Sequence, residues 1–293
     1  MDRYRLERQL GQGAMGTVHL VRRRGDNEQL ALKRVAIVSE KDRVQALNEI
    51  AILRALSHPH VVRFDDSFLD GQELCIVMEY CAGGDLSDLL RVQRDQQKRL
   101  PELEVRGMVA QLASALAHMH SRRVVHRDIK ASNVFVRGGG GGAAAGGGGG
   151  AAAGGGGSAA AGGGGSSAQR HLMLGDFGVA KALESTRAMA CTQCGTPYYL
   201  PPEVCNGAPY NTKADIWSLG VLSYEMCALR LPFQAESLPA LIMRILGGKF
   251  APLASSLSPE IRGLVHSLLQ QQPRDRPSVR QKGFQSRVGI SAA

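Results

Sequence analysis

The sequence has 293 residues, 44% apolar and 21% charged, which is enough for one large domain or two lobes with a substantial core. The net charge is +9, but the longest basic run is Arg22–Arg24 and no basic stripe is interleaved with aromatic residues, so nucleic-acid binding is not expected as the main function. No apolar stretch resembles a signal peptide or a membrane-spanning helix, and we expect a soluble, cytoplasmic protein without a membrane partner.

Strand patterns dominate the first eighty residues. Residues 6–21 indicate two strands around a glycine turn, residues 30–35 a third strand, and residues 64–78 two more. Between them, residues 44–56 have the apolar spacing of a helix. The apolar face of this expected helix consists of Val44, Leu47, Ile50 and Leu53.

The glycine turn has the pattern Gly11-x-Gly13-x-x-Gly16-x-Val18. Dinucleotide-binding folds use the same glycine spacing, but there a helix follows the turn. Here the β-branched residues 17–21 follow, which favours a second strand and a hairpin flap whose backbone N–H groups can approach phosphates. An ordinary hairpin turn is the alternative interpretation.

Lys33 lies in the third expected strand. A lysine in a strand is usually solvated, but inside a cleft its point charge suits the α- and β-phosphates of a nucleotide. A carboxylate would be needed to hold it, and Glu49 on the expected helix is a candidate.

Helical patterns follow after Cys81. Residues 102–120 have apolar side chains at spacings of three and four, and residues 215–227 indicate a mostly buried helix. Strands first and helices later predict an α+β fold with a small sheet-rich lobe and a larger helical lobe.

The most specific motif is His126-Arg-Asp-Ile-Lys-Ala-Ser-Asn133. Asp128 can orient a hydroxyl proton, Lys130 can neutralise a transferring phosphoryl group, and Asn133 offers an oxygen to a hard cation. Asp176, in Asp-Phe-Gly, supplies a second oxygen ligand. Together with the flap and Lys33, these are the parts that phosphoryl transfer requires.

One segment stands apart from the rest. Residues 138–165 contain 18 glycines, 9 alanines and 1 serine, so they cannot bury enough apolar surface to offset the entropy of ordering. Strand-like residues 134–136 and 172–174 flank the segment. We therefore expect a disordered insert in the turn of a hairpin, at a small cost in loop-closure entropy, and we expect activity to survive it.

These motifs, in this order, resemble those of eukaryotic protein kinases over roughly Tyr4 to Arg280. The resemblance implies a bilobal catalytic domain over residues 1–285, with the N-lobe at about 4–80 and the C-lobe at about 82–285, and a short tail at 286–293. It also implies ATP in the cleft and Mg²⁺, with Mn²⁺ as a substitute.

By the same resemblance, each motif position acquires an expected role. The expected nucleotide-binding residues are Leu10, Gly11, Gln12, Gly13, Ala14, Met15, Gly16, Thr17, Val18, Ala31, Lys33, Met78, Glu79, Cys81, Asp85 and Phe135. The expected catalytic residues are Asp128, Lys130, Lys33, Glu49 and Thr196, and the expected metal ligands are Asn133 and Asp176. The expected supporting contacts are a stack of Leu53, Phe64, His126 and Phe177, a pair between Glu203 and Arg276, and Asp215 beneath the catalytic loop.

Acceptor type and subfamily also follow from the resemblance. Lys130 and the sequence Gly195-Thr-Pro-Tyr-Tyr199 are similar to those of serine/threonine kinases, and Met78–Leu86, Leu174–Gly178 and Gly195–Glu203 are similar to NIMA-related kinases. That family implies protein substrates and roles in the cell cycle, microtubules, or basal bodies and cilia, hence the cytoskeleton, basal body or nucleus as further locations. The alternative is a nucleotide-binding pseudokinase scaffold.

The sequence also contains candidate regulatory features. Arg127 precedes Asp128, and Thr192 lies where the family carries an activating phosphate, so we expect phosphorylation of Thr192. Cys191-x-x-Cys194 is most simply chance spacing, with a redox switch or half of a metal site as the alternatives, and the six cysteines are expected to be reduced. His58-Pro-His60 indicates a turn rather than a metal site.

Overall fold

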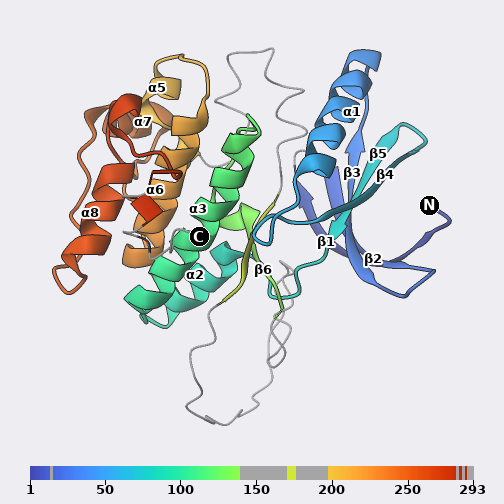
Figure 1. Cartoon of the computed structure of the whole chain (residues 1–293), viewed down its shortest axis with the longest axis horizontal. Coiled ribbons are helices and arrows are strands. Elements are labelled where there is room, and N and C mark those ends of the chain that lie inside the picture. The colour runs from blue at the N-terminus through green and yellow to red at the C-terminus, as the bar shows by residue number, and fades with distance from the viewer. Residues whose placement is uncertain (14–15, 139–169, 176–196, 282–283, 286–287, 289–293) are drawn as a thin grey trace, which may run out of the picture.

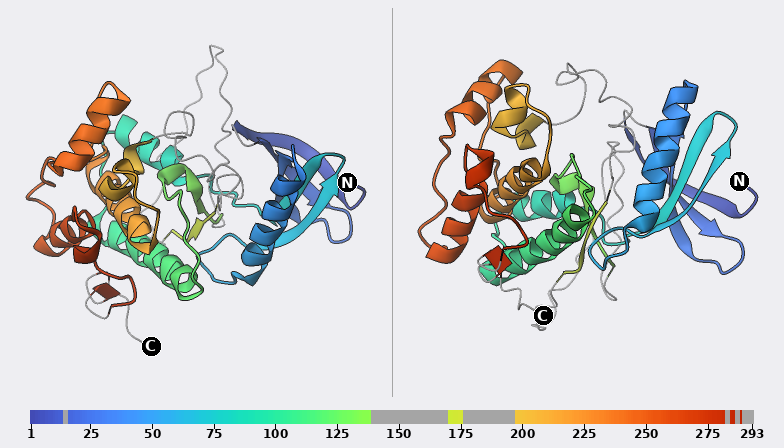
Figure 2. Two further views of the ribbon diagram at one scale, coloured as in Figure 1. Left: turned by 90° about the horizontal axis from the view of Figure 1, so that it is seen from above. Right: turned by 45° about the horizontal axis from the view of Figure 1, so that its top comes forward.

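The computed structural model contains a strand-rich N-lobe and a helical C-lobe (Figure 1). In both views of Figure 2 the sheet and α1 lie at one end of the molecule and the helices of the C-lobe lie at the other. The expected α+β, bilobal fold is therefore confirmed. The structure describes residues 1–13, 16–138, 170–175, 197–281, 284–285 and 288.

The N-lobe consists of one antiparallel sheet with the strand order β1-β2-β3-β5-β4, covered by one helix. All five expected strands form. The elements are β1 (Tyr4–Gly13), β2 (Gly16–Arg23), β3 (Gln29–Ala36), α1 (Glu40–Ala55), β4 (Phe64–Asp70) and β5 (Glu73–Glu79).

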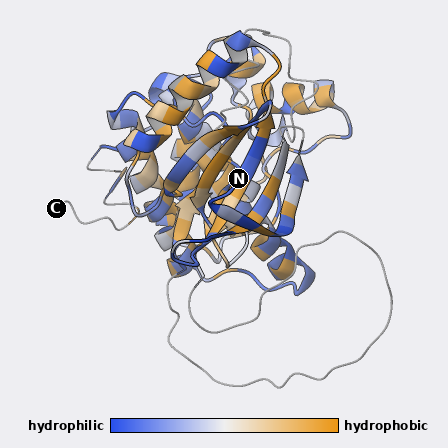
Figure 3. Ribbon diagram, turned by 90° about the vertical axis from the view of Figure 1, so that its right-hand side faces the viewer, coloured by the Kyte–Doolittle hydropathy of each residue, from blue (hydrophilic) through white to orange (hydrophobic). Residues whose placement is uncertain are grey.

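Side-chain alternation gives this sheet two apolar faces. Leu30 and Leu32 of β3 pack with Cys75 and Val77 of β5 in a cluster on one face. The intervening positions of β5 pack against α1 on the other face. Because successive side chains of a strand point to opposite faces, Lys33 shares the second face with α1. Figure 3 shows the molecule from its N-lobe end, coloured by hydropathy.

Helix α1 forms where expected, and Ile50 and Leu53 of its expected apolar face pack toward the sheet, but the other half of that face was wrong. Ala46 and Ile50 are buried, whereas Val44 and Leu47 are 53% and 50% exposed. Each step of three residues turns an α-helix by about 300°, so positions 44 and 53 lie on opposite sides. Residues spaced three apart throughout therefore drift around the helix. A face that stays buried along the helix combines spacings of three and four residues.

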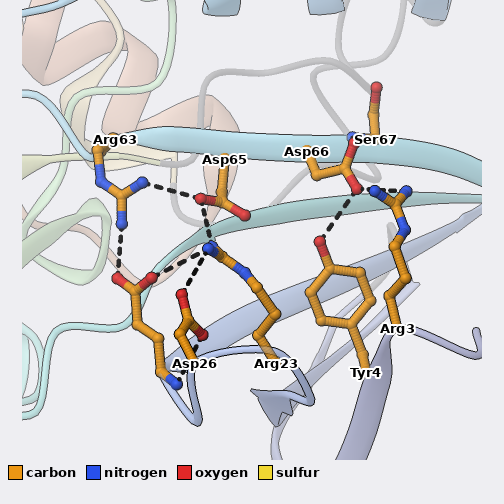
Figure 4. Close-up of polar contacts among 9 residues, drawn as sticks. Arg3, Tyr4, Arg23, Asp26, Arg63, Asp65, Asp66 and Ser67 are labelled. Atoms are coloured by element: carbon orange, nitrogen blue, oxygen red, sulfur yellow. Dashed lines mark hydrogen bonds and ion pairs between the residues drawn. The ribbon is translucent and has the colours of Figure 1, made fainter.

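Polar side chains connect the opposite edges of the sheet (Figure 4). The Tyr4 hydroxyl donates to Asp66 Oδ2 at 3.0 Å, so an edge residue of β1 contacts an edge residue of β4. Asp65 accepts from Arg23 of β2 at 2.6 Å and from Arg63 at 2.8 Å. The sheet is consequently curled, because strands at its two edges could not otherwise meet.

The C-lobe core forms around α3 and α6, with α8 also packed on α6. Every residue of α6 from Ala214 to Cys227 is buried, as the sequence predicted. Among the described residues, no helix is long and apolar enough to cross a membrane. The remaining elements are α2 (Leu86–Asp95), α3 (Glu102–Ser121), η1 (Ala131–Asn133), η3 (Pro197–Tyr199), α5 (Pro202–Cys205), α6 (Thr212–Ala228), α7 (Leu238–Gly247), α8 (Pro259–Leu268) and η4 (Pro273–Asp275).

A short hairpin lies in the C-lobe near the junction with the N-lobe. Strand β6 (Val134–Val136) pairs antiparallel with β7 (Leu172–Leu174), which confirms the expected hairpin. The expected insert at 138–165 lies outside the described residues except for Gly138.

Candidate active site

Asp215 of α6 holds the segment that contains Asp128. Its Oδ2 accepts from the backbone N–H of His126 at 3.0 Å, and its Oδ1 accepts from that of Arg127 at 3.1 Å. The side chain is fully buried, and Oδ2 also lies 2.8 Å from His120 Nε2. Arg127 has φ of +70°, a conformation that costs energy for a residue other than glycine. These bonds to Asp215 explain how that conformation is maintained, and they confirm the expected position of Asp215.

Lys130 and Asn133 both contact the carboxylate of Asp128. Lys130 Nζ lies 3.0 Å from Asp128 Oδ2, and Asn133 Nδ2 donates to the same oxygen at 3.0 Å. Asn133 Nδ2 also donates to the Asp128 backbone carbonyl at 2.8 Å, and its residue is 3% exposed. The amide orientation is thereby fixed, and its oxygen lies at the opposite end of the group, where it fits a hard cation.

His126 connects this segment to the end of β7. Its Nδ1 accepts from the Asp128 N–H at 3.3 Å, so the neutral ring carries its proton on Nε2, which lies 3.1 Å from the Gly175 carbonyl. A Cβ on Gly175 would lie 2.7 Å from Val62 and 2.9 Å from Phe135. Only glycine therefore allows β7 to approach these side chains so closely, immediately before Asp176.

The glycine flap is a hairpin, as the sequence predicted. Gly11 pairs with Val18 and Gly13 pairs with Gly16, so a second strand, not a helix, follows the turn. Gly16 has φ of +123°, and a Cβ there would collide with the Arg34 carbonyl. The third glycine is therefore required by the close approach of β3. Gln12 and Thr17 pair within the same hairpin.

Lys33 is 8% exposed and lies between Val18 of β2 and Ile76 of β5 in the sheet register. At Lys33, β3 therefore pairs on one side with a strand of the flap and on the other side with β5. Glu49 is part of α1, but its side chain lies outside the described residues, so its expected pairing with Lys33 stays a prediction.

The residues expected around adenine come from both lobes. Ala31 pairs with Met78 across β3 and β5, while Met78 and Phe135 pack against a cluster that contains Cys81. Burial raises the pKa of the Cys81 thiol to about 12, so this residue is a neutral apolar group. Leu10 lies in β1 and is half-buried. Apolar side chains of both lobes therefore meet at this position.

Residues near the segment joining the lobes have structural partners. Asp85 caps α2, where its Oδ1 accepts from the Asp88 N–H at 3.0 Å and from Ser87 Oγ at 2.5 Å. Glu79 pairs with Arg137 at 2.8 Å. Asp85 therefore positions α2 whether or not it also meets a ribose.

Two pairs of hydrogen-bonded side chains hold η3 and α5 against the rest of the C-lobe. Both terminal nitrogens of Arg276 lie 2.7 Å from the Glu203 carboxylate, which confirms the expected pair. The Tyr199 hydroxyl donates to Glu225 and accepts from the Ala131 N–H at 3.4 Å. Burial, with the negative charge of Glu225, raises the pKa of Tyr199, so the phenol stays protonated as a donor.

Other expectations concern residues outside the described ranges. These are Ala14, Met15, Asp176, Phe177, Cys191, Thr192, Cys194 and Thr196. Leu53 and Phe64 of the expected stack pack against one cluster with α1. The described cysteines are free thiols, and within the described ranges no three His, Cys, Asp or Glu side chains could hold a metal together.

The turn at His58-Pro-His60 supplies the two middle members of a column of four histidines, whose ends are His118 and His171. The ring centres of His58 and His118 are 5.0 Å apart, those of His58 and His60 are 5.7 Å apart, and those of His60 and His171 are 4.7 Å apart. Burial lowers the pKa of all four, for His58 to about 4. The column is therefore neutral near pH 7, and it connects the turn after α1 to α3 and to the residue before β7.

Comparisons with known proteins agree with this geometry. The profile of the protein kinase domain matches residues 4–285. Human Nek5 is 36% identical over 283 residues, which cover 95% of this chain and 35% of that protein. Mouse Nek3 is 38% identical over 278 residues, which cover 95% of this chain and 48% of that protein. The nekl-2 kinase of Caenorhabditis elegans is 33% identical over 290 residues, which cover 96% and 73%.

The chain belongs to the NIMA-related family of protein kinases. It spans between about a third and a half of the length of the human and mouse relatives named above. In this kinase chain, the sequence interpretation missed Tyr199 and also Gln111, whose side-chain amide bonds the backbone of Arg170 and Leu172. Gln111 interrupts the apolar pattern of α3 next to buried Leu112, and that interruption was the available signal.

Proposed function

We propose that this chain transfers the γ-phosphoryl group of ATP to serine and threonine hydroxyls of proteins. The observation that carries the proposal is the convergence of Lys130 and Asn133 on one oxygen of Asp128, each at 3.0 Å. This arrangement places a carboxylate, a cation and an amide oxygen within one short segment. Phosphoryl transfer depends mainly on such positioning and charge stabilisation.

Each side chain has a distinct task in this reaction. Asp128 accepts a hydrogen bond from the acceptor hydroxyl and orients its lone pair toward the phosphorus. Lys130, beside Asp128, neutralises negative charge on the transferring group. Lys33, on the sheet face that α1 covers, binds the nonreacting phosphates, while the flap hairpin presents backbone N–H groups to them.

The donor set also fits a divalent cation. Asn133 would contribute its amide oxygen and Asp176 a carboxylate, a pair of hard oxygen ligands that suits Mg²⁺. The cation, when bound, neutralises charge on the β- and γ-phosphates. Mn²⁺ prefers similar oxygen ligands, so we propose Mg²⁺ as the main metal and Mn²⁺ as a substitute.

The test is transfer of labelled phosphate from ATP to a generic protein substrate. Lys33→Met should reduce transfer by at least about a hundredfold, because one phosphate-binding charge is removed from the cleft. Lys98→Met is the matched control, since Lys98 is an exposed lysine of the C-lobe that is not among the residues assigned to the site. Absence of transfer by the unaltered chain with either metal would favour a scaffold that binds nucleotide without turnover.

Regulation and location are proposed on the family relationship. Thr192 is proposed as the activating phosphosite, so Thr192→Ala should lower transfer, and full activity of that variant would refute the assignment. Roles at microtubules, basal bodies or cilia, and in the cytoplasm or nucleus, are proposed in the same way. Imaging of the tagged chain would test them.

A further inference from the structure

The backbone of residues 170–175 leads directly into the proposed metal ligand Asp176. One edge of β7 pairs with β6. At the other edge, the Leu174 N–H donates to the His60 carbonyl at 2.9 Å, and the Leu174 carbonyl accepts from the Val62 N–H at 2.9 Å. The turn after α1 therefore acts as a short third strand beside β7.

Where that third strand ends, side chains continue its hydrogen bonds. Gln111 Nε2 donates to the Arg170 carbonyl at 2.8 Å, and Gln111 Oε1 accepts from the Leu172 N–H at 2.7 Å. In a strand, the C=O of one residue and the N–H two residues later point to the same side. One amide thus imitates a residue of a neighbouring strand, while His60 Nδ1 bonds the Leu172 carbonyl at 3.0 Å.

The position of Gln111 is fixed by its helix. Its neighbours on α3, Met108 and Leu112, are 0% and 1% exposed. Glu104 lies two turns earlier on the same face and forms an ion pair with Arg170. Two side chains from one face of α3 therefore hold the residues that enter β7.

The connection between β6 and β7 does not fix the register of the two strands. In ordinary hairpins a short turn sets the strand register. Here 33 residues separate Arg137 from His171, and each strand has only three residues. A connection of that length closes at a cost that grows only logarithmically, and it imposes no register. The register must therefore come from contacts outside the connection.

We propose that Gln111 is a positioning residue whose side-chain amide sets the register of β7, and so the place of Asp176, independently of the connection between β6 and β7. The metal-related part rests on the proposed function. The register part rests only on contacts among described residues. The two parts are therefore tested by separate measurements.

Residue-resolved hydrogen exchange of the full chain tests the register. Gln111→Leu keeps the approximate shape and removes both polar atoms, so exchange of the Leu172 amide should accelerate at least about tenfold. Gln270→Leu is the control, because that side chain bonds only within its own surface turn, to His266. Unchanged exchange at Leu172 in Gln111→Leu would overturn the proposal, whether or not the chain is an active kinase.

Kinetics test the consequence for the metal. Gln111→Leu should raise the Mg²⁺ concentration for half-maximal transfer about tenfold, while KM for the protein substrate stays within about twofold. A general loss of folding would lower the active fraction without this split. If Gln111→Leu does not fold, Gln111→Asn keeps the amide but is one methylene too short to make both bonds, and it should show the same split in smaller measure.

A shortened hairpin provides the decisive comparison. Replacing residues 139–168 by Asn-Gly leaves a connection of about five residues, which sets the register itself. In that background Gln111→Leu should change the Mg²⁺ requirement by less than about threefold, a coupling that a double-mutant cycle measures. Equal losses in the long and short backgrounds would show that Gln111 stabilises the lobe without setting the register, and would overturn the proposal.

Discussion

The guanidinium of Arg276 donates two hydrogen bonds of 2.7 Å to the carboxylate of Glu203, although the two residues lie 73 positions apart in the chain. Arg276 is 1% exposed, and its remaining N–H groups donate to three backbone carbonyls. Its guanidinium also lies 5.0 Å from the Trp217 ring centre. The segment that follows η4 is thereby joined to α5 and α6 at a fully buried cation.

Arg276→Met should destabilise the protein by about 3 kcal/mol, because Glu203 would be left without its buried partner. Urea unfolding measures the loss. Arg274→Met is the matched control, since that side chain is 85% exposed and should cost little. Equal unfolding midpoints for the two variants would contradict the account.

The ion pairs on the N-lobe should behave differently from this buried pair. Arg63 is 49% exposed where it bonds Asp65 and Glu28 (Figure 4). Exposed pairs contribute about 0–1 kcal/mol because water and salt screen them. We expect Arg63→Ala to lower the free energy of unfolding by less than about 1 kcal/mol, with a smaller effect in high salt. A loss comparable to that of Arg276→Met would show that the network is cooperative.

Asp215 should affect catalytic rate more than nucleotide binding. Asp215→Asn replaces one acceptor oxygen by a donor that faces a backbone N–H, so the segment containing Asp128 loses its fixed position. We expect kcat to fall about tenfold or more, with KM for ATP within about threefold. Asp275→Asn is the control, because Asp275 is 56% exposed. A variant with unchanged kcat would show that the loop keeps its geometry without Asp215.

The histidine column predicts a loss of stability in acid. His58 Nδ1 accepts from the His60 N–H at 3.1 Å, and burial, with neighbouring His118, His60 and Arg122, lowers the pKa of His58 from 6.5 to about 4. Between these pH values the unfolded chain binds more protons than the folded one, so stability falls as pH decreases through this window and levels off below it. The contribution of His58 between pH 6.5 and 5 is about 1 kcal/mol, allowing for its partial exposure.

Unfolding by urea at several pH values checks this expectation. His58→Asn keeps an acceptor for the His60 N–H but does not titrate, so its stability should decline less between pH 6.5 and 5. His266→Asn removes an exposed histidine and is the control. Parallel pH profiles for His58→Asn and the unaltered chain would refute the role of the column.

Local pattern was sufficient for the elements, whereas the contacts of Asp215 and of Glu203 with Arg276 were expected from the family resemblance. Asp215 and the Glu203–Arg276 pair lie where they were expected, as does the β6–β7 hairpin. The buried face of α1 was not predictable from threes alone, because the side that faces β5 depends on tertiary packing.

Contacts between distant segments were the other limit of sequence reasoning. The bonds of Gln111 to the backbone around His171, and the tilted ring contact between His58 and His118, join residues about sixty positions apart. No periodicity encodes such contacts, and only a polar residue beside buried positions hints at them. The chemistry was easier to infer than its support, since Asp128, Lys130 and Asn133 occur in one short motif and the groups that position them come from other elements.

The central claim is that Asp128 serves phosphoryl transfer rather than nucleotide binding. It is tested most directly by measuring, for Asp128→Asn, both ATP affinity and phosphate transfer to a protein substrate, with exposed Asp95→Asn as the control. The account predicts ATP affinity within about threefold of the unaltered chain and transfer reduced at least about a hundredfold. Transfer at the unaltered rate would contradict it.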